Sequence, residues 1–69
     1  MVRGSKKKAK SVIIMKDGNK YYVMESLRKI YESMHLPFEE IKVTVFSENL
    51  SQKEIIKIDK SEVKTFTIV

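Results

Sequence analysis

The chain has 69 residues and a formal charge of +5, with 14 Lys and Arg residues against 9 Asp and Glu residues. This length fits one domain and lies near the lower limit for a hydrophobic core that folds on its own. The absence of Cys excludes disulfides and thiolate metal sites, and no apolar run approaches the roughly 20 residues that cross a bilayer. We expect a cytoplasmic protein, because secreted domains of this size usually carry disulfides. The excess of Lys, Glu and Ile is typical of thermophilic proteins and equally of an AT-rich genome.

The positive charge is concentrated at the N-terminus. Residues 1–10 contain five basic residues and no acidic residue, whereas residues 11–69 contain nine of each and have no net charge. The first ten residues include few large apolar side chains, so we expect them to form a flexible, disordered basic arm. The sequence therefore predicts two parts: a basic arm over 1–10 and a single α+β domain over 11–69.

Residues 11–24 are predicted to form a β-hairpin. Two runs rich in β-branched and aromatic residues, 12–15 and 21–24, are separated by a short polar stretch. Within that stretch, Asp17-Gly18 supplies the positive backbone dihedral angles that a tight hairpin turn needs. This is the strongest local signal in the chain.

Residues 25–36 are predicted to form an amphipathic helix. Apolar residues in this stretch recur at the 3.6-residue spacing that places them on one face. Ser26 is the expected N-cap, and Pro37 ends the helix because it disfavours helical geometry in the residue before it. Glu25 and Lys29 are expected to pair on the solvent side.

Three more strands are predicted after the helix. Residues 41–46 alternate between apolar and polar side chains, as a half-buried strand does, and residues 63–69 are also predicted to form a strand. Residues 51–60 are ambiguous: Ser51 and Glu54 fit a capping box, whereas the β-branched isoleucines favour a strand, which we prefer. The resulting order, ββαβββ, predicts a small antiparallel sheet packed on one helix.

The large apolar side chains outside these patterns are expected to fill the core. Tyr21 and Tyr22 must face opposite sides of their strand, and one of them is expected to pack against the helix. Five side chains are expected to be core residues rather than parts of a binding site: Phe38, Phe66, Met15, Met24 and Met34.

The sequence offers little for catalysis or for metal binding. His35 is the only imidazole, and the chain has no Cys and no glycine-rich phosphate loop. Glu39 and Glu40 are adjacent, so in an extended segment their side chains point to opposite faces. We therefore predict no enzyme activity, no cofactor, no metal site and no small-molecule substrate.

Nucleic acid, DNA or RNA, is the partner that the basic arm fits best. Each phosphate that a lysine neutralises releases condensed counterions, so an arm with up to five cations gives a log–log salt slope of roughly −3 to −4.5 on duplex DNA. On the hairpin, a tyrosine beside a lysine near the turn is placed to stack on a base. The residues predicted to bind nucleic acid are Arg3, Lys6, Lys7, Lys8, Lys10, Lys16, Lys20 and Tyr21.

Two other interpretations stay open at this point. In the first, the chain is a protein–protein interaction or regulatory module, of viral or host-modulating kind, and the arm only keeps it in solution. In the second, the chain forms a homodimer through its sheet. One helix leaves the sheet edges and one sheet face uncovered, and a homodimer would bury the apolar groups there. A membrane anchor is disfavoured, because the arm lacks the apolar or lipidated partner that stable anchoring needs.

Overall fold

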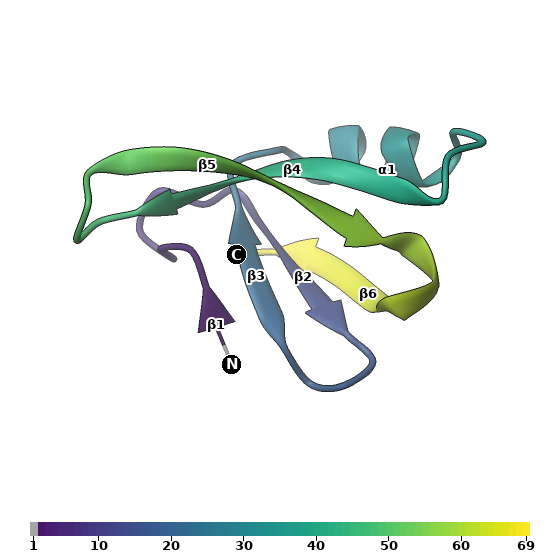
Figure 1. Ribbon diagram of the computed structural model, residues 1–69, viewed down its shortest axis with the longest axis horizontal. Coiled ribbons are helices and arrows are strands. Elements are labelled where there is room, and N and C mark those ends of the chain that lie inside the picture. Colours follow the sequence, from purple (N-terminus) through teal and green to yellow (C-terminus); the bar gives the residue numbers. More distant parts are fainter. Residues whose placement is uncertain (1) are drawn as a thin grey trace.

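The computed structural model describes residues 2–69, and within them six strands and one α-helix follow one another along the chain (Figure 1). The elements are β1 (Val2–Arg3), β2 (Ser11–Met15), β3 (Lys20–Val23), α1 (Leu27–Met34), β4 (Glu40–Ser47), β5 (Gln52–Asp59), the 3₁₀ helix η1 (Lys60–Glu62) and β6 (Val63–Ile68). The α+β class is confirmed, and the predicted order ββαβββ matches from β2 onward. The short strand β1 is an addition to it.

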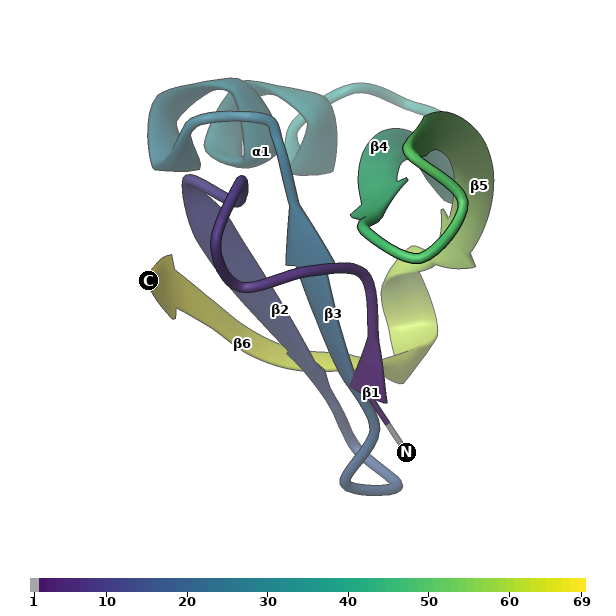
Figure 2. The same cartoon turned by 90° about the vertical axis from the view of Figure 1, so that its left-hand side faces the viewer.

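The strands form one sheet in the order β5-β4-β3-β2-β6. Neighbours along this path pair antiparallel, whereas β1 adds to β3 in parallel. β3 and β4 pair at Val23 and Val45 and then diverge, so the sheet bends at this point. The long β4–β5 hairpin therefore lies to one side of the layer formed by β2, β3 and β6, and α1 closes the end between them (Figure 2).

The core fills the space between the two parts of the bent sheet and the helix. Ile13 and Val23 bring fully buried side chains from β2 and β3, Ile30 comes from α1, and Val43 comes from β4. The buried apolar side chains are Val12, Ile13, Met15, Val23, Ile30, Ile41, Val43, Val45 and Ile58. Because side chains alternate along a strand, the same β4 and β5 that bury these residues present their intervening residues outward.

α1 begins at the predicted N-cap and ends slightly earlier than predicted. The hydroxyl of Ser26 accepts the N–H of Lys29 at 3.4 Å, and the last helical residue is Met34. His35 is the C-cap and donates its backbone N–H to the last turn, two residues before Pro37. Within residues 2–69, no helix is both long enough and apolar enough to cross a membrane.

Residues 52–59 form strand β5, which confirms the preferred interpretation of the ambiguous segment. β5 pairs with β4 along its whole length, from Glu40 opposite Asp59 to Ser47 opposite Gln52. A capping-box helix starting at Ser51 would have given up this ladder of main-chain hydrogen bonds. Ser51 instead takes a positive φ of 48° in the turn that leads into β5.

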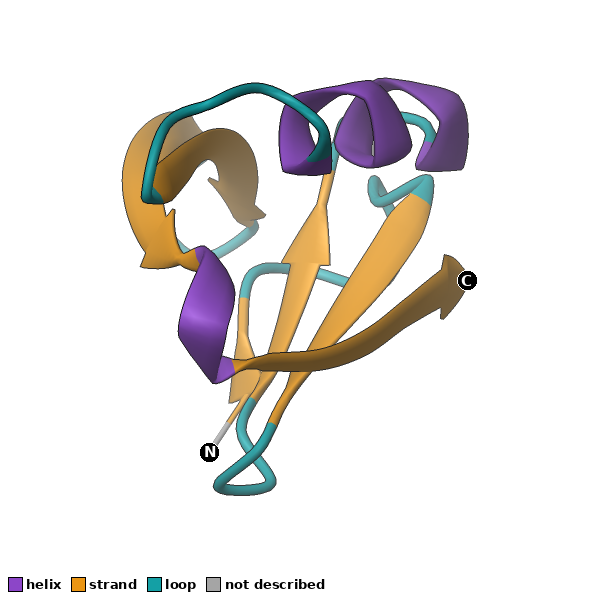
Figure 3. Ribbon diagram, turned by 90° about the vertical axis from the view of Figure 1, so that its right-hand side faces the viewer, coloured by secondary structure: helices purple, strands orange, loops and turns teal. Residues whose placement is uncertain are grey.

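A 3₁₀ turn joins β5 to β6 (Figure 3). The Asp59 carboxylate caps this turn, because its Oδ1 accepts the backbone N–H of Ser61 at 3.0 Å and the Ser61 hydroxyl at 2.9 Å. These hydrogen bonds, the backbone one first, hold the pKa of Asp59 below its ordinary value. The turn returns the chain to β2, where β6 forms the end of the sheet.

The predicted disorder of the N-terminal arm is not confirmed, because residues 2–10 follow a defined path over the sheet. β1 lies beside β3, the Ser5 N–H donates to the Phe46 carbonyl at 2.8 Å, and the Lys10 N–H donates to the Val23 carbonyl at 3.0 Å. The segment is therefore attached to β3 and β4 by main-chain hydrogen bonds on both sides of its lysines.

The divergence of β3 from β4 explains why this polar segment is ordered. Where the two strands separate, each leaves main-chain groups unpaired, and the N-terminal segment supplies partners for them. Gly4 makes the close approach feasible: its φ is 90°, and a Cβ at this position would overlap the Tyr22 carbonyl oxygen. Side-chain composition predicts disorder here, but the order comes from main-chain contacts that composition does not reveal.

Candidate functional site

The outward side of the β4–β5 hairpin carries three lysines. Ile41, Val43 and Val45 of β4 point into the core, so the residues between them point outward. The register of the β4–β5 ladder determines which of these outward residues lie opposite one another. We call this surface the outer face: it comprises Lys42 opposite Lys57, Thr44 opposite Ile55, and Phe46 opposite Lys53, and Glu40 opposite Asp59 continues the same side of the hairpin toward η1.

The lysines of the outer face form no ion pair with a carboxylate of the described chain. Among residues 2–69, the ion pairs are Arg3 with Glu54 and Arg28 with Glu32, and neither includes an outer-face lysine. Lys42 lies directly opposite Lys57, a juxtaposition of like charges that destabilises a sheet. Such an arrangement is suited to an anionic partner from outside the chain.

The N-terminal segment adds its cations to the same surface. The Nζ of Lys8 lies 5.6 Å from the centroid of the Phe46 ring, within range of a cation–π interaction. Lys10, Lys29 and Lys53 come from the N-terminal segment, α1 and β5, and all three line one hollow of about 350 Å³. We call the combined set the basic surface; its members are Lys8, Lys10, Lys29, Lys42, Lys53 and Lys57.

One predicted ion pair does not form, and this leaves a lysine of the basic surface without its partner. The carboxylate of Glu25 was expected to pair with Lys29 across one helical turn. Instead, Glu25 Oε1 accepts the backbone N–H of Thr44 at 2.7 Å, because the helix begins at Leu27 and Glu25 lies in the loop before it. The Glu25 carboxylate therefore holds β4 against the loop before α1 and does not pair with Lys29.

The predicted cations of the N-terminal segment divide into two groups. Lys8 and Lys10 belong to the basic surface, and Lys6 and Lys7 lie exposed in the turn that precedes them. Arg3 lies on β1 and forms an ion pair with Glu54 of β5. Its guanidinium is therefore already engaged within the chain.

The predicted residues of the hairpin lie elsewhere. Lys16 and Lys20 flank the β2–β3 turn, whereas Lys10 lies beyond the other end of β2, six residues before Lys16 or about 20 Å away along the strand. Tyr21 is half-buried and packs against the core, so its ring is not free to stack on a base, while Tyr22 is half-buried on the opposite side of β3.

Sequence analysis missed the lysines of β4, β5 and α1. Lys42 falls on a polar position of an alternating strand, and Lys53 and Lys57 share one face of β5 because they are four positions apart, an even number. The sequence shows which lysines share a face of one strand. It does not show the register of β4 and β5, which brings the lysines of the two strands together. The net charge of zero over 11–69 also concealed them, because it does not show which lysines form ion pairs.

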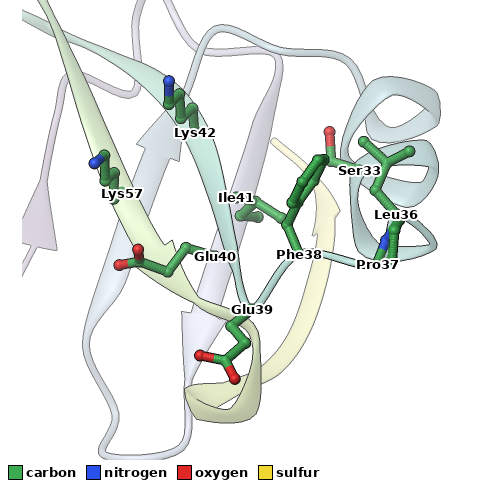
Figure 4. A pocket seen from close by; sticks show the side chains of 9 residues that line it. All are labelled: Ser33, Leu36, Pro37, Phe38, Glu39, Glu40, Ile41, Lys42 and Lys57. Atoms are coloured by element: carbon green, nitrogen blue, oxygen red, sulfur yellow. The ribbon is translucent and has the colours of Figure 1, made fainter.

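An open groove of about 750 Å³ lies at one end of the outer face, between the C-terminal end of α1 and the start of β4 (Figure 4). Phe38 lines it and is 66% exposed, so the expectation that this residue fills the core is wrong. Phe38 lies in the loop between α1 and β4, whose main chain is held at Leu36 and Glu39 by hydrogen bonds from Lys60, and its ring stays at the surface. The groove is lined by Ser33, Leu36, Pro37, Phe38, Glu39, Glu40, Ile41, Lys42 and Lys57.

His35, the only imidazole of the chain, packs against Tyr31 at the end of α1. His35 Nδ1 lies 2.9 Å from the Tyr31 carbonyl oxygen, and the His35 and Tyr31 rings pack with centroids 4.3 Å apart. Within residues 2–69, no three His, Asp or Glu side chains gather as they would around a metal ion.

No family model, no curated protein and no solved structure matches this chain. Its function is therefore inferred from the residues of the basic surface and of the groove.

Proposed function

We propose that this protein is a non-catalytic nucleic-acid-binding protein whose basic surface contacts phosphate groups. The outer face carries the proposal, because Lys42, Lys53 and Lys57 project from one rigid hairpin and take no ion pair among residues 2–69. Phosphates along a nucleic-acid backbone are the anions that such a row of cations fits, since each contact releases counterions.

The basic surface supports this function better than a flexible arm would. Its lysines are fixed to strands, to a helix and to a segment that main-chain hydrogen bonds hold in place. Less conformational freedom is therefore lost on binding than when a disordered arm becomes ordered. Six phosphate contacts correspond to a log–log salt slope of about −5 on duplex DNA and about −4 on a single strand.

Salt-titrated fluorescence anisotropy tests the proposal with a short labelled single strand and the duplex of the same sequence. The informative variant replaces Lys42, Lys53 and Lys57 by Gln. The matched control replaces Lys16, Lys20 and Lys64 by Gln, which removes the same charge from places outside the basic surface. We expect the first variant to lower the slope by about 2 to 3 and the control to leave it unchanged.

Two results would contradict the proposal. The first is that the unmodified protein binds neither DNA nor RNA at low salt. The second is that both variants lose affinity equally, because binding would then follow net charge rather than the arrangement of the lysines.

A second candidate function is self-association through β6, as a module whose lysines only keep it in solution. β6 pairs with β2 on one side and ends the sheet, and Ile68 near its end is 70% exposed. An unpaired strand edge with apolar side chains is a template for a second copy. Light scattering at micromolar concentration would show a dimer that Ile68→Lys converts to a monomer; a monomeric unmodified protein would remove this candidate.

A further inference from the structure

The groove beside the outer face combines an apolar wall with cations on its rim. Leu36, Phe38 and Ile41 form the wall between α1 and β4, and Lys42 and Lys57 lie on the strands at its edge. Figure 4 shows the Phe38 ring standing between the helix end and β4, with both lysines further along the two strands. The groove is thus continuous with the basic surface, because Lys42 and Lys57 belong to both.

The loop that carries Phe38 is held in place on both sides of the ring. The Lys60 side chain donates through Nζ to the Leu36 carbonyl, and the Lys60 backbone N–H donates to the Glu39 carbonyl at 2.9 Å. A single residue of η1 therefore fixes the main chain before and after Phe38. The exposed ring is preorganised, so a planar group can stack on it without the loop having to become ordered first.

The charges along the groove give it a direction. Glu39 and Glu40 are exposed at the start of β4, and their carboxylates, which point away from the Phe38 ring (Figure 4), repel phosphate there. Lys42 and Lys57 attract phosphate at the other end. This polarity suits a nucleotide whose base lies on Phe38 and whose phosphate lies between the two lysines.

We propose that the groove binds an unpaired base of a single-stranded nucleic acid, with Phe38 as the stacking platform and Lys42 and Lys57 as the phosphate contacts. This inference rests on the proposed function and narrows its substrate class. A volume of about 750 Å³ lies in the range of small-molecule sites and accommodates a base with its sugar. Proteins that bind single strands combine a basic path with exposed aromatic rings in this way.

A duplex is expected to contact the lysines but not the Phe38 ring. Its bases are stacked inside the helix, so a duplex offers phosphates to the lysines but no base face to Phe38. The groove therefore predicts that Phe38 contributes to the binding of single strands and not to the binding of duplexes, whereas the lysines contribute to both.

The test compares Phe38→Ala with Phe38→Trp by fluorescence anisotropy on a labelled single strand and on its duplex. We expect Phe38→Ala to weaken single-strand binding by about 5- to 150-fold and to leave duplex binding unchanged, while Phe38→Trp retains single-strand affinity. Leu50→Ala is the matched control, because Leu50 is also 66% exposed but lies in the β4–β5 turn away from the groove. We expect it to change neither affinity. Circular dichroism verifies that each variant is folded.

The outcomes separate this inference from the proposed function. If the unmodified protein binds nucleic acid but Phe38→Ala leaves single-strand affinity unchanged, or lowers single-strand and duplex affinity equally, the base site is refuted and the basic surface stands. If the unmodified protein binds no nucleic acid, both are refuted. If Phe38→Ala instead converts a dimer to a monomer in light scattering, the groove holds a second copy of the chain, and the base site is refuted.

Discussion

The basic surface and the β2–β3 turn both carry exposed lysines, but the two regions differ in what surrounds those lysines. At the turn, Asp17 lies between Lys16 and Lys20 and organises the turn, accepting the backbone N–H of Asn19 at 2.9 Å. On the basic surface, lysines from four separate segments of the chain come together, and the nearby carboxylate of Glu25 accepts a hydrogen bond from the backbone instead.

The comparison shows that two carboxylates near the basic surface hold the fold together and form no ion pair with its lysines. Glu25 accepts from Thr44, and Glu54 pairs with Arg3 on the N-terminal segment. Each of these contacts engages an acidic group in holding the fold together. The lysines of the outer face then remain available to an outside anion, although the domain as a whole has no net charge over residues 11–69.

The largest expected effect is a loss of unfolding free energy from a substitution on the buried face of β4. Ile41 is 3% exposed and neighbours Lys42 in sequence, but the two side chains lie on opposite faces of β4. Ile41→Ala is expected to lower the free energy of unfolding by about 2–5 kcal/mol, because it leaves a cavity in the core. Chemical denaturation measures this loss; an unfolding free energy equal to that of the unmodified protein would contradict the packing of β4.

A second prediction compares alanine substitutions at two glycines, Gly4 in the N-terminal segment and Gly18 in the β2–β3 turn. Gly4→Ala forces a Cβ onto the Tyr22 carbonyl at a positive φ, and is expected to cost about 1–3 kcal/mol of unfolding free energy. Gly18→Ala also has a positive φ but meets open space, so its cost is expected to be about 1 kcal/mol.

Nucleic-acid affinity distinguishes the two glycine variants further. Gly4→Ala displaces the segment that carries Lys8 and Lys10 and is expected to weaken binding. Gly18→Ala alters the β2–β3 turn, which lies outside the basic surface, and is expected to leave affinity unchanged. Equal affinity for both variants would show that the docking of the N-terminal segment has no role in binding.

A third prediction concerns the like charges that face each other on the outer face. Lys42→Gln removes repulsion with Lys57 and is expected to raise the free energy of unfolding by about 0.2–1 kcal/mol. The same substitution is expected to lower the salt slope of single-strand binding by about 0.7, since one phosphate contact is lost. Thermal or chemical denaturation beside a salt titration checks both; a loss of stability would show that Lys42 has a stabilising partner.

The smallest expected effect is a change in acid stability at the η1 turn. The hydrogen bonds from Ser61 lower the pKa of Asp59, so the stabilisation is present above the ordinary aspartate pKa of about 3.9. It is lost as the pH falls through the lowered value in the folded state. Asp59→Asn is expected to lose less stability than the unmodified protein on acidification below pH 4, as measured by denaturant titration; parallel acid profiles would contradict this cause.

Elements with local signals could be predicted from the sequence. The hairpin turn at Asp17-Gly18, the Ser26 N-cap and the alternating strand at 41–46 each depend on residues a few positions apart. The structure confirms all three elements, although at the turn Gly18 takes a positive φ and Asp17 does not. The fold class followed from their order. β5 was harder, because its capping-box residues and its β-branched residues favour different structures until the partner strand is known.

The candidate site could not be predicted, because it depends on contacts between distant parts of the chain. The register that sets Lys42 opposite Lys57 joins residues 15 positions apart, and the attachment of the N-terminal segment depends on main-chain groups of β3 and β4. The exposure of Phe38 depends on Lys60, which holds its loop from η1. Composition places the cations in the first ten residues but does not show which of them the fold assembles with others.

The most direct measurement of the central claim compares two variants that each lose three positive charges. One replaces Lys6, Lys7 and Lys8 by Gln and so removes one member of the basic surface; the other replaces Lys42, Lys53 and Lys57 and removes three. In a salt titration on a single strand, we expect the slope to fall by about 0.7 for the first variant and about 2 for the second. An unchanged slope for the second variant, with binding abolished in the first, would show that the N-terminal lysines act alone.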